Sequence, residues 1–344
     1  MKVSFLQMKR ALNVALFVLL LSLVGTKNTF AQTQLATLQH GDDLSVFYGT
    51  NAFVEAHNAA AGGDIITLSG GSFVPCTISK GITLHGAGCE ANMEANTVPT
   101  VFSSDISLNV TDAVNPLIIE GVVFSCTVIP MNLNNPKFIK CYMNQWRGNS
   151  GYCNVHNAQF VNCFLKDFYS NYCVSTIFVN TVVSALRTGS SSSGTDSCIA
   201  YNSIVRYNDV YIYRISAYNS IFVAYSNIQY AYNGFFQNCI GIKPGNSQSP
   251  FNSSYTSDCV LYNSFSDVFE TFTGTFNYGV SFVLKDEIAT GFLGTDGTQV
   301  GIYGGLKPYD IRPSYMVVRR CNVANSTTGD GMLNVDIEVI TEGE

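Results

Sequence analysis

Val161-Asn162-Cys163-Phe164, Val179-Asn180-Thr181-Val182, Tyr201-Asn202-Ser203-Ile204 and Tyr218-Asn219-Ser220-Ile221 repeat one short phrase along this chain. Looser copies are Phe124-Ser125-Cys126, Ile139-Lys140-Cys141-Tyr142, Gln237-Asn238-Cys239-Ile240 and Tyr262-Asn263-Ser264-Phe265. The third positions are 15, 22, 18, 22, 17, 19 and 25 residues apart. An irregular period of about 20 residues indicates stacked supersecondary units.

Each phrase has the pattern of a short strand. Apolar and polar residues alternate over four to six positions, and β-branched and aromatic types dominate. Strands and turns in units of about 20 residues predict an all-β fold, a single right-handed parallel β-helix over about residues 44–293. Coils stacked about 4.8 Å apart would align one repeat position into a ladder. We expect that ladder to hold Cys126, Cys141, Cys163, Thr181, Ser203, Ser220, Cys239 and Ser264.

Asn in the phrase is expected at the bend of each coil. Asn tolerates left-handed backbone, and its amide can form a hydrogen bond with the next coil. The alternative fold is a β-sandwich or propeller with coincidental Asn-Ser turns. Such folds carry frequent Asn-Gly or Asp-Gly hairpin turns, which are rare in this sequence. The pattern therefore favours the β-helix.

The segment before the repeats predicts a cap and first coils. Residues 53–61 form the best helical stretch, and an amphipathic helix can cover the first open coil of a solenoid. Gly63-Asp64-Ile65-Ile66-Thr67-Leu68, Gly71-Ser72-Phe73 and Ile82-Thr83-Leu84-His85-Gly86-Ala87-Gly88 follow. At these residues the chain resembles the pectin-lyase-like family of secreted right-handed parallel β-helices. The resemblance is close over residues 52–88 and looser to about residue 269, and it implies the fold more strongly than any activity.

The end of the chain is different. Asp296-Gly297-Thr298-Gln299-Val300-Gly301-Ile302-Tyr303-Gly304-Gly305 resembles a phrase that closes many bacterial cell-surface β-helix proteins. After it, residues 315–318 and 333–339 are predicted strands joined by a turn at 326–331. We expect a helix-capped β-helix over residues 32–293. Residues 294–344 would be a small β module that covers the last coil or engages a surface.

The first 31 residues have the pattern of a secretory signal peptide. Lys2, Lys9 and Arg10 precede an apolar run over residues 11–25, and cleavage is expected after Ala31. A membrane anchor is the alternative, but the run is shorter than the roughly 20 residues that a spanning helix needs. No later segment is apolar enough to span a bilayer. We therefore expect an exported protein that is secreted, periplasmic or on the outer surface of a bacterium.

Composition limits the partners. Charged residues make up 12% of the chain, about half the usual share, and the net charge is -6. A nucleic-acid-binding protein needs a basic surface, so we expect no nucleic-acid partner. The 11 cysteines include no close Cys pair and no His at metal spacing, so neither a metal site nor a cofactor is expected. The oligomeric state cannot be inferred.

Catalytic clusters are missing from the sequence. Hydrolases of such folds use paired carboxylates, but the only Asp pair, Asp42-Asp43, precedes the coils. The four histidines, His40, His57, His85 and His156, have no partners near them in the sequence and are interpreted as structural.

Tyrosines are the one enriched feature. Tyr169 and Tyr172 are followed at similar offsets in later coils by Tyr207, Tyr211, Tyr213, Tyr225, Tyr230 and Tyr232, with Arg206, Asp209 and Arg214 interleaved. Stacking would bring them to one lateral face, with Tyr211 and Tyr213 pointing outward. Exposed tyrosines with polar neighbours suit sugar rings, whereas an aromatic ladder that only stabilises the solenoid is the alternative.

Three classes of function remain open. A non-catalytic surface or secreted protein that binds polysaccharide or a cell-surface glycan, or mediates adhesion, fits the missing catalytic clusters. A polysaccharide lyase or glycoside hydrolase acting on an acidic polysaccharide such as pectin is implied by the resemblance alone, with Arg206 or Arg214 as the base of a lyase. A structural spike or spacer is the third class.

Overall fold

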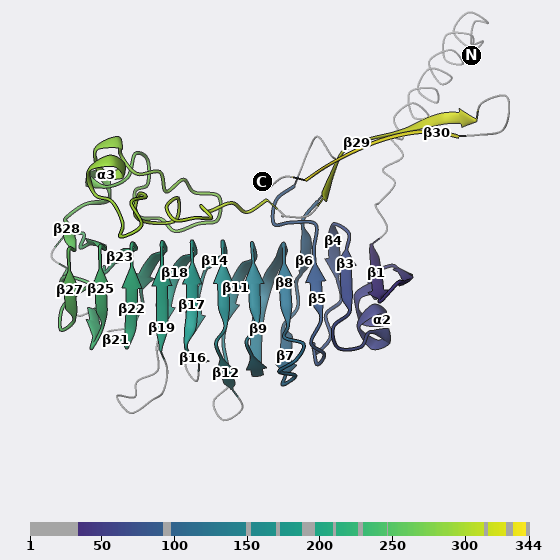
Figure 1. Cartoon of the computed structure of the whole chain (residues 1–344), viewed down its shortest axis with the longest axis horizontal. Helices are drawn as coiled ribbons and strands as arrows, with labels where there is room; N and C mark the ends of the chain where they lie inside the picture. Colours follow the sequence, from purple (N-terminus) through teal and green to yellow (C-terminus); the bar gives the residue numbers. More distant parts are fainter. Residues whose placement is uncertain are drawn as a thin grey trace, which may run out of the picture. The chain divides into compact units, whose positions relative to one another are not determined.

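The computed structural model is a right-handed parallel β-solenoid of about eight turns, nearly all β (Figure 1). The predicted fold class is therefore confirmed. The structure describes residues 34–91, 98–148, 153–169, 173–187, 197–208, 211–225, 230–245, 247–312, 316–327 and 333–341.

Two large sheets form the walls of the solenoid. The first sheet has 12 strands, in spatial order β2 (Asp43–Tyr48), β1 (Leu35–His40), β3 (Ile65–Leu68), β5 (Thr83–His85), β8 (Ile118–Glu120), β10 (Lys137–Ile139), β13 (Gln159–Val161), β17 (Thr176–Val179), β19 (Cys198–Tyr201), β22 (Ile215–Tyr218), β25 (Phe235–Gln237) and β27 (Tyr255–Ser257).

The second sheet has 14 strands and bends around the solenoid. They are β4 (Gly71–Phe73), β6 (Thr100–Phe102), β7 (Ile106–Val110), β9 (Val122–Asn134), β11 (Tyr142–Trp146), β12 (Asn154–His156), β14 (Phe164–Leu165), β15 (Phe168–Tyr169), β16 (Cys173–Val174), β18 (Val182–Arg187), β20 (Ile204–Tyr207), β23 (Ile221–Val223), β26 (Ile240–Ile242) and β28 (Val260–Tyr262). A separate parallel pair, β21 (Tyr211–Tyr213) and β24 (Tyr230–Tyr232), belongs to two later coils.

The first coil carries the predicted helical cap. Strand β1 pairs antiparallel with β2 and β3, and helix α2 (Ala52–Ala59) buries Phe53 and His57. The Phe53 ring lies 5.0 Å from that of Phe102, which points into the solenoid. Aromatic packing therefore joins the cap to the interior.

Most of the described coils use left-handed backbone at two bends. The first bend follows the first-sheet strand and has φ between 46° and 53° at Lys140, Asn162, Asn180, Asn202, Asn219, Asn238 and Asp258. The second bend precedes the next first-sheet strand and has positive φ at Asn135, Asn157, Ser175, Arg214, Asn233 and Ser253. Asn dominates because it enters this region at the lowest strain of any residue with a side chain.

The side-chain ladder lies directly after the first bend. Each ladder residue accepts from the backbone of the coil before it: Cys163 N donates to Thr181 Oγ1 at 3.2 Å, Thr181 N to Ser203 Oγ at 3.2 Å, and Ser203 N to Ser220 Oγ at 3.0 Å. These bonds satisfy buried amides that face the interior.

The register corrects the ladder at both ends. Pairing of Val123 with Tyr142 places Val122, not Cys126, opposite Cys141. Pairing of Ile240 with Val260 places Cys259, not Ser264, opposite Cys239. Ser264 instead caps the short 3₁₀ helix η1 (Phe265–Asp267). Cys126 lies in the long strand β9, four residues beyond the ladder position.

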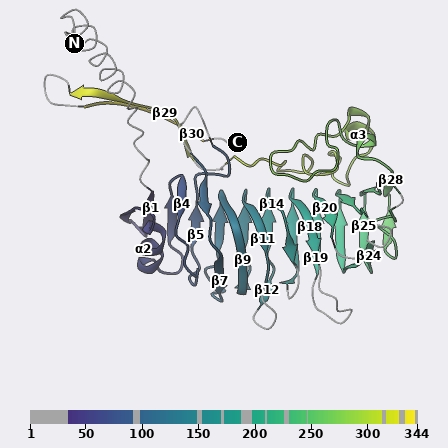
Figure 2. The same ribbon diagram turned by 180° about the vertical axis from the view of Figure 1, so that it is seen from behind.

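The parallel coils end at β28, and residues 264–312, here called the strap, run back along the stack (Figures 1 and 2). The strap includes helix α3 (Asp286–Gly291) and covers the part of the outer face of the second sheet that lies next to the first bend. Its Val300 and Ile302 pack with Val182, Ile204 and Ile221 in a second core outside the coils.

The strap binds the Asn row of the first bend in reverse order. Asn238 Nδ2 donates to Leu293 O, Asn219 Oδ1 accepts from Thr295 N, and Asn162 Nδ2 donates to Pro308 O. The phrase at 296–305 therefore lies along the bend rather than over the last coil. The amides of Asn162, Asn180, Asn219 and Asn238 bind the strap instead of the next coil, whereas Asn157 Nδ2 at the second bend does bind Asn135 Oδ1 in the preceding coil.

The predicted C-terminal strand pair is present. Strands β29 (Met316–Thr327) and β30 (Leu333–Thr341) pair antiparallel.

Candidate ligand-binding surfaces

The tyrosines predicted to share one face lie in three different places. Tyr207 points into the solenoid and is 1% exposed. Tyr225 and Arg206 lie on the outer side of the second sheet, where the strap begins. The Tyr225 hydroxyl donates to Gly274 O, and the Arg206 guanidinium lies 5.0 Å from the centre of the Phe276 ring. This pair therefore anchors the strap.

Arg206 is poorly placed to act as a catalytic base. Its Nε donates to the carbonyl oxygen of Ser184, and its guanidinium also faces the Tyr225 ring at 5.7 Å. Burial is the largest cause lowering the pKa of Arg206, and the nearby Arg187 charge lowers it further. These contacts hold the Arg206 guanidinium against its own sheet and the strap, so it does not face open solvent. Arg214 lies at the second bend with φ of 52°.

The remaining predicted tyrosines form a small patch. Tyr211 pairs with Tyr230 and Tyr213 with Tyr232 on the neighbouring strands β21 and β24. The Tyr213 and Tyr232 rings meet edge-to-face with centres 5.7 Å apart, and Ile212, which lies between Tyr211 and Tyr213 in sequence, is buried. The side chain of Tyr211, and Asp209 and Tyr172 altogether, lie outside the described residues.

A longer aromatic surface lies on the outer face of the first sheet, formed by Tyr201, Tyr218, Phe235 and Tyr255. We call it the aromatic row. Ring centres are 5.2 Å apart between Tyr201 and Tyr218, 5.7 Å between Tyr218 and Phe235, and 5.4 Å between Phe235 and Tyr255. Tyr201 is 40% exposed and Tyr255 is 65% exposed. The first and last of these pairs are stacked, whereas Tyr218 and Phe235 are tilted by 47° because Phe235 is in register with Ser216. Four successive coils therefore present neighbouring aromatic rings on this face.

This row was missed because two of its members, Tyr201 and Tyr218, are part of the repeat phrase itself. Tyr201 and Tyr218 precede the bend Asn and were interpreted as strand residues without a ligand role. Their neighbours Ala200 and Ala217 are fully buried. Because successive strand residues point to opposite faces, that alternation places the two tyrosines outside.

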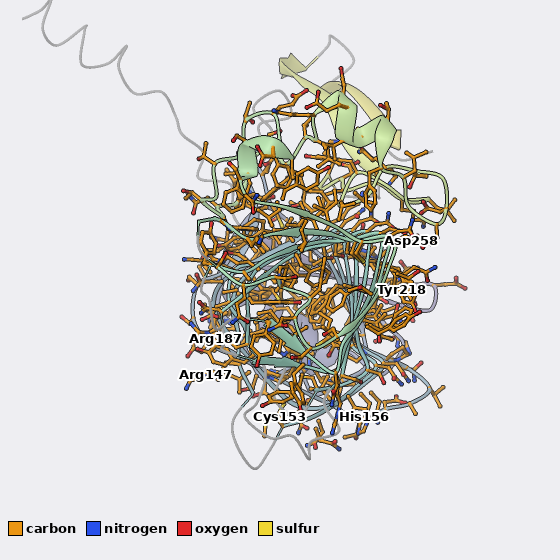
Figure 3. All side chains as sticks on the ribbon, turned by 90° about the vertical axis from the view of Figure 1, so that its left-hand side faces the viewer. Arg147, Cys153, His156, Arg187, Tyr218 and Asp258 are labelled. Carbon is orange, nitrogen blue, oxygen red and sulfur yellow. The ribbon has the colours of Figure 1, made fainter. Side chains whose placement is uncertain are left out.

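A polar surface lies on the outer side of the second sheet. The Tyr169 ring has the Arg147 guanidinium 5.2 Å from its centre and the Arg187 guanidinium also at 5.2 Å. Asp167 Oδ1 accepts from Arg187 Nε at 3.0 Å. In the view along the stack, Arg147 and Arg187 lie on the side away from Tyr218 (Figure 3). Guanidinium groups bind carboxylate, sulfate or phosphate, so this cluster could hold an anionic group.

A cavity of about 310 Å³ lies between the strap and the second sheet. Its walls include Phe164, Phe282 and Tyr303, and Glu90 and Asp310 provide carboxylates. Burial would raise the pKa of Asp310, but hydrogen bonds from Arg312 hold it below its usual value. Asp310 Oδ1 already accepts from Arg312 Nε at 3.1 Å, so the Asp310 carboxylate is bound by a side chain of the protein itself.

The histidines are held by neighbours in the fold. His40 Nδ1 is 2.7 Å from Asp64 Oδ1, His57 Nε2 accepts from Ser79 N, and His85 Nδ1 is 3.5 Å from Glu120 Oε2. His156 Nε2 lies 2.8 Å from Asn154 Oδ1. Burial is the larger cause that lowers the pKa of His57, with a smaller contribution from Lys80.

Among the described residues, no three side chains of metal-binding type gather closely enough to hold a metal ion. Over the same residues, no helix is long and apolar enough to cross a membrane. Comparison with known proteins finds no matching family model, no matching curated protein and no matching solved structure.

Proposed function

We propose that this protein is an exported β-helix protein that binds a polysaccharide along the aromatic row of its first sheet. The observation that carries the proposal is the row of neighbouring rings Tyr201, Tyr218, Phe235 and Tyr255 across four coils. The exposed parts of these rings give an apolar surface for the C–H groups of sugars, and the tyrosine hydroxyls can bond to sugar hydroxyls. One ring per coil suits a linear chain that lies along the stack.

Other features agree with this role. The signal-peptide pattern at residues 1–31 supports export, where extracellular polysaccharides are found. The resemblance to pectin-lyase-like proteins supports a carbohydrate ligand by analogy. Simple binding is favoured over catalysis because the row carries no carboxylate pair, since acid and base duty in glycoside hydrolysis needs two carboxylates.

A glycan array with the protein lacking residues 1–31 tests the proposal. Tyr201→Ala/Tyr218→Ala should weaken binding to any glycan hit by at least about tenfold, because aromatic anchors dominate such contacts. The matched control is Tyr213→Ala/Tyr232→Ala, which removes another ring pair from a different surface. Unchanged melting temperatures would show that both variants fold.

The outcomes separate the alternatives. Loss of binding only in the Tyr201 and Tyr218 variant supports the aromatic row. Loss only in the Tyr213 and Tyr232 variant would move the site to the β21–β24 patch and overturn the proposal. Equal binding by all three proteins, or no glycan hit, would also overturn it.

Action on an acidic polysaccharide is the second candidate, and the Arg147–Tyr169–Arg187 cluster favours it. This cluster places the Arg147 guanidinium beside that of Arg187, which Asp167 already binds, in a protein whose overall charge is negative. Arg147→Gln/Arg187→Gln should then abolish a preference for uronate-rich over neutral glycans. New reducing ends or unsaturated uronate absorbance after incubation would indicate cleavage, and their absence would leave binding alone.

A further inference from the structure

Cys239 and Cys259 meet at the last step of the side-chain ladder. Both follow a first bend, and pairing of Ile240 with Val260 places them opposite each other on adjacent parallel strands. Neighbouring strands are about 4.8 Å apart. Disulfides span Cα separations of roughly 4.4–6.8 Å, so the backbone spacing already suits a bond. The Cys259 thiol reaches back to the preceding coil, where its Sγ donates to Phe236 O at 3.5 Å.

This pair differs from the other stacked thiols in its position. Cys141 and Cys163 are also opposite each other in the ladder, but they lie deep in the stack and are at most 1% exposed. Cys259 belongs to the last coil and is only partly buried. Its neighbouring strands β27 and β28 are edge strands among the described residues, where Tyr255 is 65% and Leu261 is 47% exposed. An oxidant can therefore reach Cys259 more easily than Cys163.

The thiols also differ in reactivity. The neighbouring Cys239 side chain, acting as a hydrogen-bonding group, is the largest cause that lowers the pKa of Cys259 to about 7, against the opposing effect of burial. Burial raises the pKa of Cys163 and of Cys239 well above the usual thiol value. Since the thiolate is the attacking species in thiol–disulfide exchange, Cys259 should react first.

We propose that Cys239 and Cys259 are a modification site, a dithiol that a disulfide oxidant converts into an inter-coil disulfide tying the last coil to the stack. The Cys259 thiolate attacks the oxidant RSSR, forms a mixed disulfide and releases one thiolate RS⁻. Cys239 loses its proton to that RS⁻ and attacks Cys259 Sγ, which breaks the mixed bond and releases a second RS⁻. With one proton from each cysteine, two thiols become one disulfide and RSSR becomes two RSH.

The bond has a structural consequence at the place where the strap begins. Ser264 and η1 follow β28 directly, so a covalent link from Cys259 to Cys239 would fix the point from which the strap departs. The inference is independent of glycan binding, because it depends only on the ladder register, which places the two thiols on adjacent strands, and on the exposure of Cys259.

The test uses the full folded protein, prepared reduced, and glutathione disulfide as the oxidant. Free thiols are alkylated at successive times, and peptides are mapped by mass spectrometry. We expect a 239–259 disulfide to form before any other, while Cys141, Cys163, Cys153 and Cys173 stay alkylatable after unfolding. Cys239→Ser should instead accumulate a stable glutathione adduct on Cys259.

Two controls keep the result interpretable. Cys259→Ser should form neither the adduct nor the disulfide, whereas Cys163→Ser, which changes the matched buried pair, should oxidise at 239–259 as the parent does. Oxidation at 141–163 before 239–259 would overturn the proposal. Full retention of both thiols in the folded parent protein would overturn it as well, whether or not any variant folds.

Discussion

Asn180 and Ile302 are separated by 122 residues in the chain, yet the Asn180 side-chain amide donates to the Ile302 carbonyl oxygen at 2.8 Å. The same Nδ2 donates to Gly304 O at 2.7 Å. Asn180 is 2% exposed and has φ of 46°, so one residue both turns the coil and holds the strap.

Removing the Asn180 amide should weaken the strap. Asn180→Gly keeps the left-handed backbone but leaves two carbonyl oxygens of the strap without donors, and we expect the free energy of unfolding to fall by about 1–3 kcal/mol. Urea unfolding measures this change, and limited proteolysis reports whether residues 264–312 are released first.

The matched control for that variant is Asn157→Gly at the second bend. Asn157 also has positive φ, but its amide forms an exposed bond to Asn135, so the expected change is within about 0.5 kcal/mol. Equal effects of the two substitutions would show that the strap contacts add nothing to stability.

The ladder hydroxyls should be interchangeable with each other but not with a methyl group. Thr181 Oγ1 accepts from Cys163 N and donates to Val179 O or Phe160 O. Thr181→Val keeps the shape but leaves a buried amide without a partner, so we expect a loss of about 1–3 kcal/mol. Thr181→Ser keeps the oxygen and should lose less. Thermal unfolding of both variants measures the two losses in stability. Equal losses would contradict the role of the Thr181 hydroxyl as an acceptor.

The internal aromatic stack should matter far more than the external one for stability. Phe160 is fully buried, with its ring centre 5.0 Å from that of Phe138 and 5.2 Å from that of Phe168. Phe160→Ala should cost about 3–5 kcal/mol through the cavity that it leaves. Phe235→Ala on the aromatic row removes the same ring from a half-exposed site and should cost much less. Chemical denaturation of both proteins compares them directly.

The N-terminal cap should weaken in mild acid. The folded pKa of His57 is lowered below 6.5, chiefly by burial, while the unfolded chain keeps the ordinary value. Below pH 6.5 the unfolded state therefore binds more protons than the folded state, and stability falls as the pH decreases towards the folded pKa. Above pH 6.5 the contribution is fully present. Protonation would also remove the acceptor for Ser79 N.

Hydrogen exchange in residues 52–60 at pH 7.5 and 5.5 measures this effect. The parent protein should lose protection in the cap at the lower pH. His57→Gln, which keeps an acceptor but does not titrate, should lose less. Identical behaviour of the two proteins would exclude His57 as the cause.

Short-range sequence patterns predicted the coils well, because each bend and each strand depends on residues that are close together in the sequence. The bend Asn at positions such as 162, 180 and 202 reports left-handed backbone, which depends on a single residue and its neighbours. The ladder prediction was wrong at its two ends, where the steps of 15 and 25 residues between expected ladder positions differ from the other steps. Those two steps were the available signal that Cys126 and Ser264 belong to other positions.

The exposed surfaces were harder to predict, because they depend on which strand residues point outward and on contacts between residues that are far apart in the sequence. Tyr207 is two residues from the inward Val205, so alternation puts it inside, but similar offsets after each phrase suggested a common outer face. Arg206 points outward and is covered by Phe276, 70 residues further along the chain. No local pattern encodes a segment that returns across the stack.

The returning strap also changes how the solenoid holds together. In a stack where each coil touches only its neighbours, one end can fray while the rest persists. A single segment that bonds to Asn238, Asn219, Asn180 and Asn162 requires those coils to be in register at the same time. The strap is synthesised after the coils. It can therefore dock only once the coils that carry its Asn partners have stacked. We therefore expect coils 162–238 and the strap to unfold as one cooperative unit.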